Sequence, residues 1–138
     1  MTDEVKSTIR VRLYPNQQQE QQLLQFCGAA RWVYNWGLQR WRQRYEDGQN
    51  TTAFDLANEL VFIKKMDVTS WLKESPSQGL QQTLLNLGRA FAGFFVNTAK
   101  YPRFKKRGHR DSFHFPQHVE VDAAKRQLKL PKLGYVVY

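Results

Sequence analysis

The chain has 138 residues, of which 41% are hydrophobic and 14% aromatic, so it can fold as one domain and does not have the composition of a disordered protein. Its formal net charge is +9 at pH 7, concentrated in residues 100–132, where ten lysines and arginines accompany three acidic residues. A local excess of positive charge attracts polyanions such as nucleic acids. The alternative is a solvated positive face that only keeps the protein soluble.

The sequence also argues against several classes of protein. A single cysteine, Cys27, excludes an internal disulfide bond and is typical of a reducing compartment. The first ten residues lack the apolar core of a signal peptide, and no apolar run approaches the roughly 20 residues of a membrane-spanning helix. We therefore expect a cytoplasmic protein that does not associate with a membrane.

The first predicted elements are a strand and a long helix. Residues 9–13 alternate apolar and basic side chains, as a half-buried strand does, and Asn16 then caps a helix that runs to about Gly48. The helix has two nearly opposite apolar faces, the first comprising Leu23, Cys27, Ala30, Tyr34, Leu38 and Trp41, and the second Ala29, Trp32, Val33 and Trp36. Such a helix lies between two layers, supplied either by this domain or by a partner that covers one face.

Two more helices and several short strands follow. Thr52 and Asp55 form a capping-box pattern at the start of the second helix, and Ser75 with Pro76 predicts the start of a third, which runs to about Thr98. Four segments then alternate as strands do: SFHF, HVEVD, QLKLPKL and YVVY. The order of elements predicts an α+β fold in which the first strand pairs with the last ones and the three helices form an insertion.

No arrangement of residues indicates catalysis. His109, His114 and His118 have a spacing loosely compatible with metal ligation, but no cysteine or carboxylate pattern completes a tetrahedral site. Cys27 lies on an apolar helix face, as a small core residue would. The carboxylates are scattered, whereas a metal-dependent phosphodiesterase gathers two or more of them around divalent ions. We therefore expect no metal site, no cofactor and no enzyme activity in this chain.

The basic and aromatic stretch from Tyr101 to His118 is the strongest functional signal. The residues predicted to bind phosphates are Lys100, Arg103, Lys105, Lys106, Arg107 and Arg110. Tyr101 and Phe104 are equally compatible with stacking on unpaired bases and with a place in the core. Phe113 and Phe115 are predicted to be core residues.

The start of the third helix is a second candidate contact. Ser77, Gln78 and Gln81 lie where the helix dipole favours a negative charge, and glutamine can read the edge of an adenine. Helix capping would explain Gln78 but does not explain Ser77 or Gln81. We predict that these three residues contact DNA.

Seven strings occur along the chain in a fixed order: RLYP, GAARWVYNWGL, SWLKESPSQGLQQ, NLGRAFAGFF, YPRFKKRG, SFHFPQ and LKLPKLG. In this order, from Arg12 to Gly134, the chain resembles the N-terminal part of the TnpB (OrfB) proteins of bacterial insertion sequences. The resemblance implies an RNA-guided DNA endonuclease related to type V CRISPR effectors, from a bacterium or an archaeon. It implies a wedge-like β-barrel formed by residues 1–15 and 100–138, interrupted by a helical recognition domain of helix-turn-helix character at residues 16–99.

The resemblance also implies partners, which are a guide RNA and double-stranded DNA beside the target. The surface that reads the DNA motif would include Phe54 on the second helix and Gln117, in addition to the residues at the start of the third helix. The family's RuvC-like nuclease domain and zinc module would follow Tyr138, so this chain is expected to bind and not to cut. The alternative is an interaction module, in which Trp32 and Trp36 dock the nuclease domain or form a homodimer.

Overall fold

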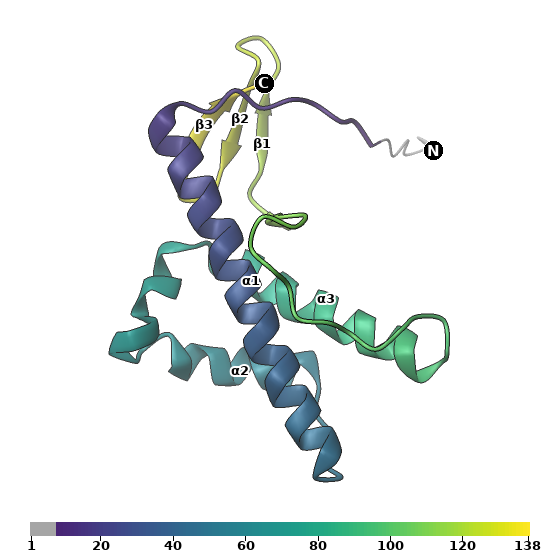
Figure 1. The fold of residues 1–138 in the computed structure, drawn as a ribbon. Helices are drawn as coiled ribbons and strands as arrows, with labels where there is room; N and C mark the ends of the chain where they lie inside the picture. Colours follow the sequence, from purple (N-terminus) through teal and green to yellow (C-terminus); the bar gives the residue numbers. More distant parts are fainter. Residues whose placement is uncertain (1–7) are drawn as a thin grey trace, which may run out of the picture.

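The computed structural model describes residues 8–138, which form a helical part and a small sheet joined by one long helix (Figure 1). The helices are α1 (Gln17–Glu46), α2 (Ala53–Ile63), the 3₁₀ helix η1 (Asp67–Glu74) and α3 (Ser77–Phe95), and the strands are β1 (Glu120–Asp122), β2 (Gln127–Leu130) and β3 (Gly134–Val137). The mixed α+β class predicted from the sequence is therefore confirmed. In Figure 1, α1 begins beside the sheet and crosses α2 and α3 with its C-terminal half.

The predicted capping residues start two of the helices. Asn16 Oδ1 accepts a hydrogen bond from the Gln19 N–H at 2.8 Å, and Gln19 Oε1 accepts one from the Asn16 N–H at 3.0 Å. Thr52 and Asp55 form the same reciprocal pair at the start of α2. Each pair satisfies two backbone N–H groups that have no partner inside the helix.

The start of α3 differs from the prediction that Ser75 is its N-cap. Pro76 occupies the N-cap position with a non-helical ψ of 124°, so the helix begins at Ser77, and no side chain in the described part of the chain caps it. The Ser75 side chain is instead buried, and its Oγ has no hydrogen-bond partner among residues 8–138. The Nζ of Lys132 donates to the backbone carbonyls of Lys73 and Ser75, which fixes the chain before the helix.

The core lies where α2, η1 and α3 cover α1. Its buried members are Ala29, Val33, Tyr34, Leu38, Trp41, Ala53, Leu56, Leu60, Leu72, Leu80, Leu84, Leu87 and Phe91. The Trp41 and Phe91 rings stack with centroids 4.5 Å apart. Because this set includes residues from both predicted apolar faces of α1, the domain itself supplies most of both layers around the helix.

The 3₁₀ helix η1 was not predicted, so there are four helices in the described chain and not three. Eight residues of 3₁₀ helix do not carry the 3.6-residue apolar repeat on which the prediction depended. Only Leu72 of this segment is buried, and Trp71 packs against the core from its edge.

The sheet is open, and the barrel expected from the resemblance is not confirmed within residues 8–138. The three strands are antiparallel in the order β1-β2-β3, with Leu128 opposite both Val121 and Val136. The first predicted strand pairs with the last one only at a single bridge, where the Tyr14 N–H donates to the Val137 carbonyl at 2.7 Å. Residues 8–13 form no strand, and Ile9 is 78% exposed because no element among residues 8–138 covers it.

The segment SFHF is also not a strand, although it alternates as one. Phe113 packs against the core on α3 and α1, and its ring lies 5.4 Å from that of Phe26 and 4.9 Å from that of Phe115. The aromatic side chains are thus half-buried against helices, which confirms a packing role without pairing the backbone in a sheet.

Candidate nucleic-acid interface

The predicted phosphate-binding residues lie on a long loop, residues 96–119, which contains no helix or strand and runs back along α3 to β1 (Figure 1). Side chains of α1 hold it in two places. The Asn35 amide accepts from the Lys105 N–H at 2.7 Å and donates to the Lys105 carbonyl at 3.0 Å. Arg31 forms an ion pair with Asp111 at 3.2 Å, and Asp111 also accepts from the Gly108 N–H at 3.1 Å. This basic loop is therefore fixed on a helix although it has no secondary structure of its own.

All six predicted phosphate-binding residues are exposed on this loop. Within residues 8–138 the ion pairs are Arg31–Asp111 and Arg44–Glu59, so none of the six is paired with an acidic side chain. The Lys105 ammonium lies 4.3 Å from the centre of the Tyr34 ring, which is a favourable cation–π distance. The loop thus presents positive charge that the described protein does not neutralise.

The two predicted stacking residues have different surroundings. Tyr101 is half-buried, packs edge-on against Phe91 and Phe94 at 5.5 and 5.0 Å, and has the pKa of its phenol raised by burial. Phe104 is 48% exposed. The Arg42 guanidinium lies over both rings, at 5.9 Å from Tyr101 and 5.6 Å from Phe104. Tyr101 is therefore largely committed to the core, whereas Phe104 is exposed beside Arg42.

Three of the predicted DNA-reading residues come together from two distant segments. Ser77 and Gln78 at the start of α3 and Gln117 on the loop line one cavity of about 230 Å³. The Gln78 Nε2 donates to the Gln117 Oε1 at 3.1 Å. The other two predicted readers do not line this cavity: Gln81 is exposed further along α3, and Phe54 is 73% exposed on the first turn of α2.

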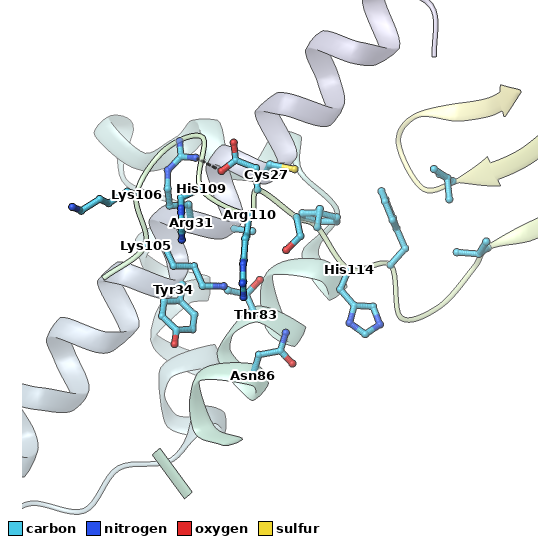
Figure 2. A pocket seen from close by; sticks show the side chains of 17 residues that line it. Cys27, Arg31, Tyr34, Thr83, Asn86, Lys105, Lys106, His109, Arg110 and His114 are labelled. Carbon is cyan, nitrogen blue, oxygen red and sulfur yellow. Dashed lines mark hydrogen bonds and ion pairs between the residues drawn. The ribbon is translucent and has the colours of Figure 1, made fainter. Parts of the chain in front are cut away.

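A larger cavity, of about 530 Å³, opens between α1, α3 and the basic loop (Figure 2). We call it the α1–α3 cavity. Arg31, Tyr34, Thr83 and Asn86 line it, and sequence reasoning assigned none of them a binding role. Arg31 could have been suspected, since it is a charged residue within the otherwise apolar and aromatic middle of α1.

Cys27 also borders this cavity, and its surroundings disfavour a nucleophile. Burial raises the pKa of the Cys27 thiol, the Asp111 carboxylate raises it further, and Arg31 opposes the shift. The thiolate is the reactive form, so Cys27 stays protonated and inert near neutral pH.

The histidines do not assemble a metal site. Among residues 8–138 no three histidine, cysteine, aspartate or glutamate side chains lie close enough together to bind one metal ion. His109 and His114 border the α1–α3 cavity, whereas His118 borders the smaller one. No helix in the described chain is both long and apolar enough to cross a membrane.

Comparison with known proteins places the chain in a family. A family model of OrfB proteins of the IS605 group, described as a helix-turn-helix domain, matches residues 1–50. The described part of that range holds the N-terminal segment and α1, and the next helix, α2, begins at Ala53.

Three curated proteins are similar to the chain. "Putative RNA-guided DNA endonuclease InsQ" of Escherichia coli K12 is 43% identical over 130 residues, which are 94% of this chain and 32% of that protein. A "Putative RNA-guided DNA endonuclease" of Streptomyces pristinaespiralis is 36% identical over 78% of this chain and 27% of its own length. "Virulence protein VsdF" of Salmonella dublin is 32% identical over 71% of this chain and 91% of its own length. The chain thus spans about a third of the first two relatives and nearly all of the third, and it belongs to the TnpB (OrfB) family of insertion-sequence proteins.

Proposed function

We propose that this chain is the nucleic-acid-binding N-terminal module of a TnpB-like RNA-guided DNA endonuclease. In this proposal the basic loop holds a guide RNA scaffold, and the start of α3 reads a short motif in the DNA beside the target. The observation that carries it is the basic loop itself, whose six exposed cations have no acidic partner within residues 8–138 and are fixed to α1 through Lys105 and Asp111. The names of the two longer relatives agree with it.

The loop suits phosphates because its charges are exposed and its backbone is anchored. Each lysine or arginine that neutralises a phosphate releases condensed counterions, and this release supplies much of the affinity at low salt. Anchoring by Asn35 reduces the entropy that the loop loses when RNA binds, since the backbone at Lys105 is already ordered.

The pair formed by Gln78 and Gln117 suits an adenine. Gln78 donates to Gln117, which leaves the Gln78 Oε1 free to accept and the Gln117 NH₂ group free to donate. Adenine presents the complementary pattern in the major groove, an N6 amino donor beside the N7 acceptor. Ser77 lines the same cavity, and the proposal assigns it a contact with the adjacent backbone or base.

The proposal divides the chain as the family does. In this proposal residues 1–15 and 100–138, of which residues 1–7 lie outside the described residues, belong to a wedge-like unit with the three strands, and residues 16–99 are the recognition helices. DNA cleavage is assigned to a RuvC-like domain of the full-length protein, and this chain is assigned binding alone.

Fluorescence anisotropy with labelled RNA from the source element and with its flanking duplex tests the proposal. Binding should weaken steeply with salt, and Lys106→Gln should lower the slope of log K against log [salt] by about 0.7–0.9. The matched control is Lys125→Gln, which removes the same charge from the exposed turn between β1 and β2. Binding that is absent or does not depend on salt would refute the proposal.

A second candidate function is protein docking at a groove of three tryptophans. The Trp32 and Trp36 rings are parallel with centroids 6.3 Å apart, and Trp71 meets Trp32 edge-on at 6.3 Å. They line a groove of about 410 Å³ and remain only half-buried. Such a groove would dock another domain of the longer protein or a second copy of the chain. Sedimentation velocity over a range of concentrations tests whether a second copy of the chain binds this groove, since a monomer at every concentration excludes a homodimer.

A further inference from the structure

Three of the proposed phosphate contacts, Lys105, Lys106 and Arg110, line the α1–α3 cavity, whereas the DNA-reading pair Gln78 and Gln117 does not. Its volume of about 530 Å³ is within the range of small-ligand sites, roughly 300–1,000 Å³. Figure 2 shows α1 contributing Tyr34, α3 contributing Thr83 and Asn86, and the basic loop contributing Lys105 and Arg110. Three segments distant in the sequence thus enclose one concave space.

The residues that line this cavity carry a net positive charge, which favours an anion over a cation as its ligand. Arg31, Lys105, Lys106 and Arg110 line it together with a single acidic residue, Asp111. Asp111 is already bound to Arg31 at 3.2 Å and to a loop N–H, so two lysines and one arginine are left without an acidic partner among residues 8–138. A metal cation would find a net positive environment there, whereas a phosphate would be attracted.

Arg110 adopts a backbone conformation that the local sequence does not favour. Its φ is +53°, in the left-handed region that costs a residue with a Cβ about 1–2 kcal/mol. Figure 2 shows its side chain extending into the cavity toward Thr83 and Asn86. It forms no ion pair or hydrogen bond with another side chain in the described part of the chain. Asn97, His118, Arg126 and Lys132 share this backbone region, so it is the unpaired Arg110 side chain in the cavity, and not its backbone alone, that points to a ligand.

The wall opposite Arg110 has polar groups suited to a base. Thr83 and Asn86 are one turn apart on α3, so they lie on the same face of the helix. The Thr83 hydroxyl donates to the Gly79 carbonyl at 3.0 Å, and the Asn86 Oδ1 accepts from Gln82 at 3.0 Å. The Asn86 NH₂ group therefore remains free to donate to a ligand.

We propose that the α1–α3 cavity binds one unpaired nucleotide of a bound RNA strand. Lys105 and Lys106 hold its phosphate, the Arg110 guanidinium stacks on its base, and the Asn86 NH₂ group donates to an acceptor on the base edge. The nucleotide is unpaired because a base within a helix cannot enter a concave site, and guanidinium planes stack on splayed-out bases. This inference rests on the proposed RNA binding and adds to it the site of one nucleotide.

Two probes separate the possible sources of such a nucleotide. In a ¹H–¹⁵N NMR titration, 5′-UMP should shift the signals of Tyr34 and Asn86 saturably, whereas inorganic phosphate should shift only the signals of the basic loop. In an anisotropy assay, each nucleotide of an RNA strand that the chain binds is replaced in turn by an abasic one. At one position, that of the nucleotide in the cavity, the replacement should lower the affinity about tenfold.

The variants Arg110→Gly and Asn86→Ala should each weaken RNA binding about five- to tenfold. The matched control, Arg103→Gly, removes the same charge from a part of the loop outside the cavity. It should lower only the slope of log K against log [salt]. Arg110→Gly should not lower the melting temperature, because glycine accepts a positive φ without strain.

If salt-dependent RNA binding is intact but no abasic position matters, and the cavity variants behave like Arg103→Gly, the cavity assignment is wrong and the proposed function stands. If 5′-UMP binds in the cavity while every abasic RNA binds normally, the cavity takes a free nucleotide and its assignment to the RNA strand is overturned. If no RNA binds at all, the proposed function itself fails.

Discussion

The contact between Gly79 and the basic loop makes a quantitative prediction about stability. A Cβ added at Gly79 would lie 2.1 Å and 2.3 Å from two ring carbons of Phe113 and 2.8 Å from the His114 carbonyl oxygen. Because the nearest groups include backbone, and because the Phe113 ring is held against Phe26 and Phe115, the clash cannot be relieved by turning one flexible side chain.

The cost of Gly79→Ala follows from two opposing contributions. Overpacking a filled site costs about 1–3 kcal/mol, and this one lies toward the upper end because the contacts are so short. Replacing glycine by alanine in a helix gains about 0.5–1 kcal/mol. The free energy of unfolding should therefore fall by about 2 kcal/mol.

The matched control is Gly88→Ala on the same helix. Its Cβ would lie 3.4 Å from the Ala53 Cβ and 3.6 Å from the Trp41 ring, which are ordinary contacts. This variant should gain the helix contribution without the clash and become more stable by about 0.5–1 kcal/mol. Urea unfolding followed by circular dichroism measures both, and equal stabilities of the two variants would refute the packing described between α3 and the basic loop.

Three other predictions concern the loop, the core edge and the DNA-reading pair. Asn35→Ala removes both hydrogen bonds to the Lys105 backbone, so hydrogen exchange at the Lys105 amide should accelerate while the unfolding free energy changes by only about 1–2 kcal/mol; unchanged exchange would contradict the anchoring. The pKa of Lys64 is lowered, first by burial and then by two neighbouring lysines, so the unfolded chain binds more protons between the lowered pKa and 10.5. The contribution of Lys64 to the free energy of unfolding therefore rises with pH across that window. Lys64→Met should raise the urea midpoint at pH 7, and this increase should become smaller as the pH approaches 10.5. Gln117→Ala should relax sequence preference at one position of a randomised DNA flank, and an unchanged profile would remove Gln117 from the reading surface.

The elements that the sequence predicts well are those determined by local contacts. Capping boxes at Asn16 and Thr52 depend on residues three positions apart, and the apolar repeat of α1 depends on neighbours along one helix. Both signals are contained in short segments of the sequence. The order of the helices and strands that these segments predict gives the mixed fold class.

The predictions that fail depend on contacts distant in the sequence. SFHF alternates as a strand does, but Phe113 packs against Gly79 on α3 instead of lying beside another strand. Ser75 has the sequence pattern of an N-cap, yet contacts from Lys132, 57 residues away, fix the chain in another conformation. The α1–α3 cavity could not be predicted for the same reason, since its walls meet only in the folded chain.

The length and direction of α1 relate the two parts of the molecule. Near its start, the Gln19 side chain donates to the Tyr135 carbonyl of β3 at 2.6 Å, and Asn35 on the same helix clamps the basic loop. These two attachment points are 16 residues apart, or about 24 Å along the axis at 1.5 Å per residue. One uninterrupted helix therefore fixes the spacing of these two attachment points, while Lys132 ties the sheet separately to the chain before α3.

Residues inserted into α1 would thus change both the spacing and the rotation between these two attachment points. A single residue inserted between Gln22 and Phe26 would rotate Gln19 by about 100° around the helix axis relative to Asn35, while seven inserted residues would keep that angle within about 20° and separate the two attachments by about 10 Å more. The rotational phase of α1, as much as the identity of either side chain, therefore determines whether Gln19 can reach β3 while Asn35 holds the basic loop.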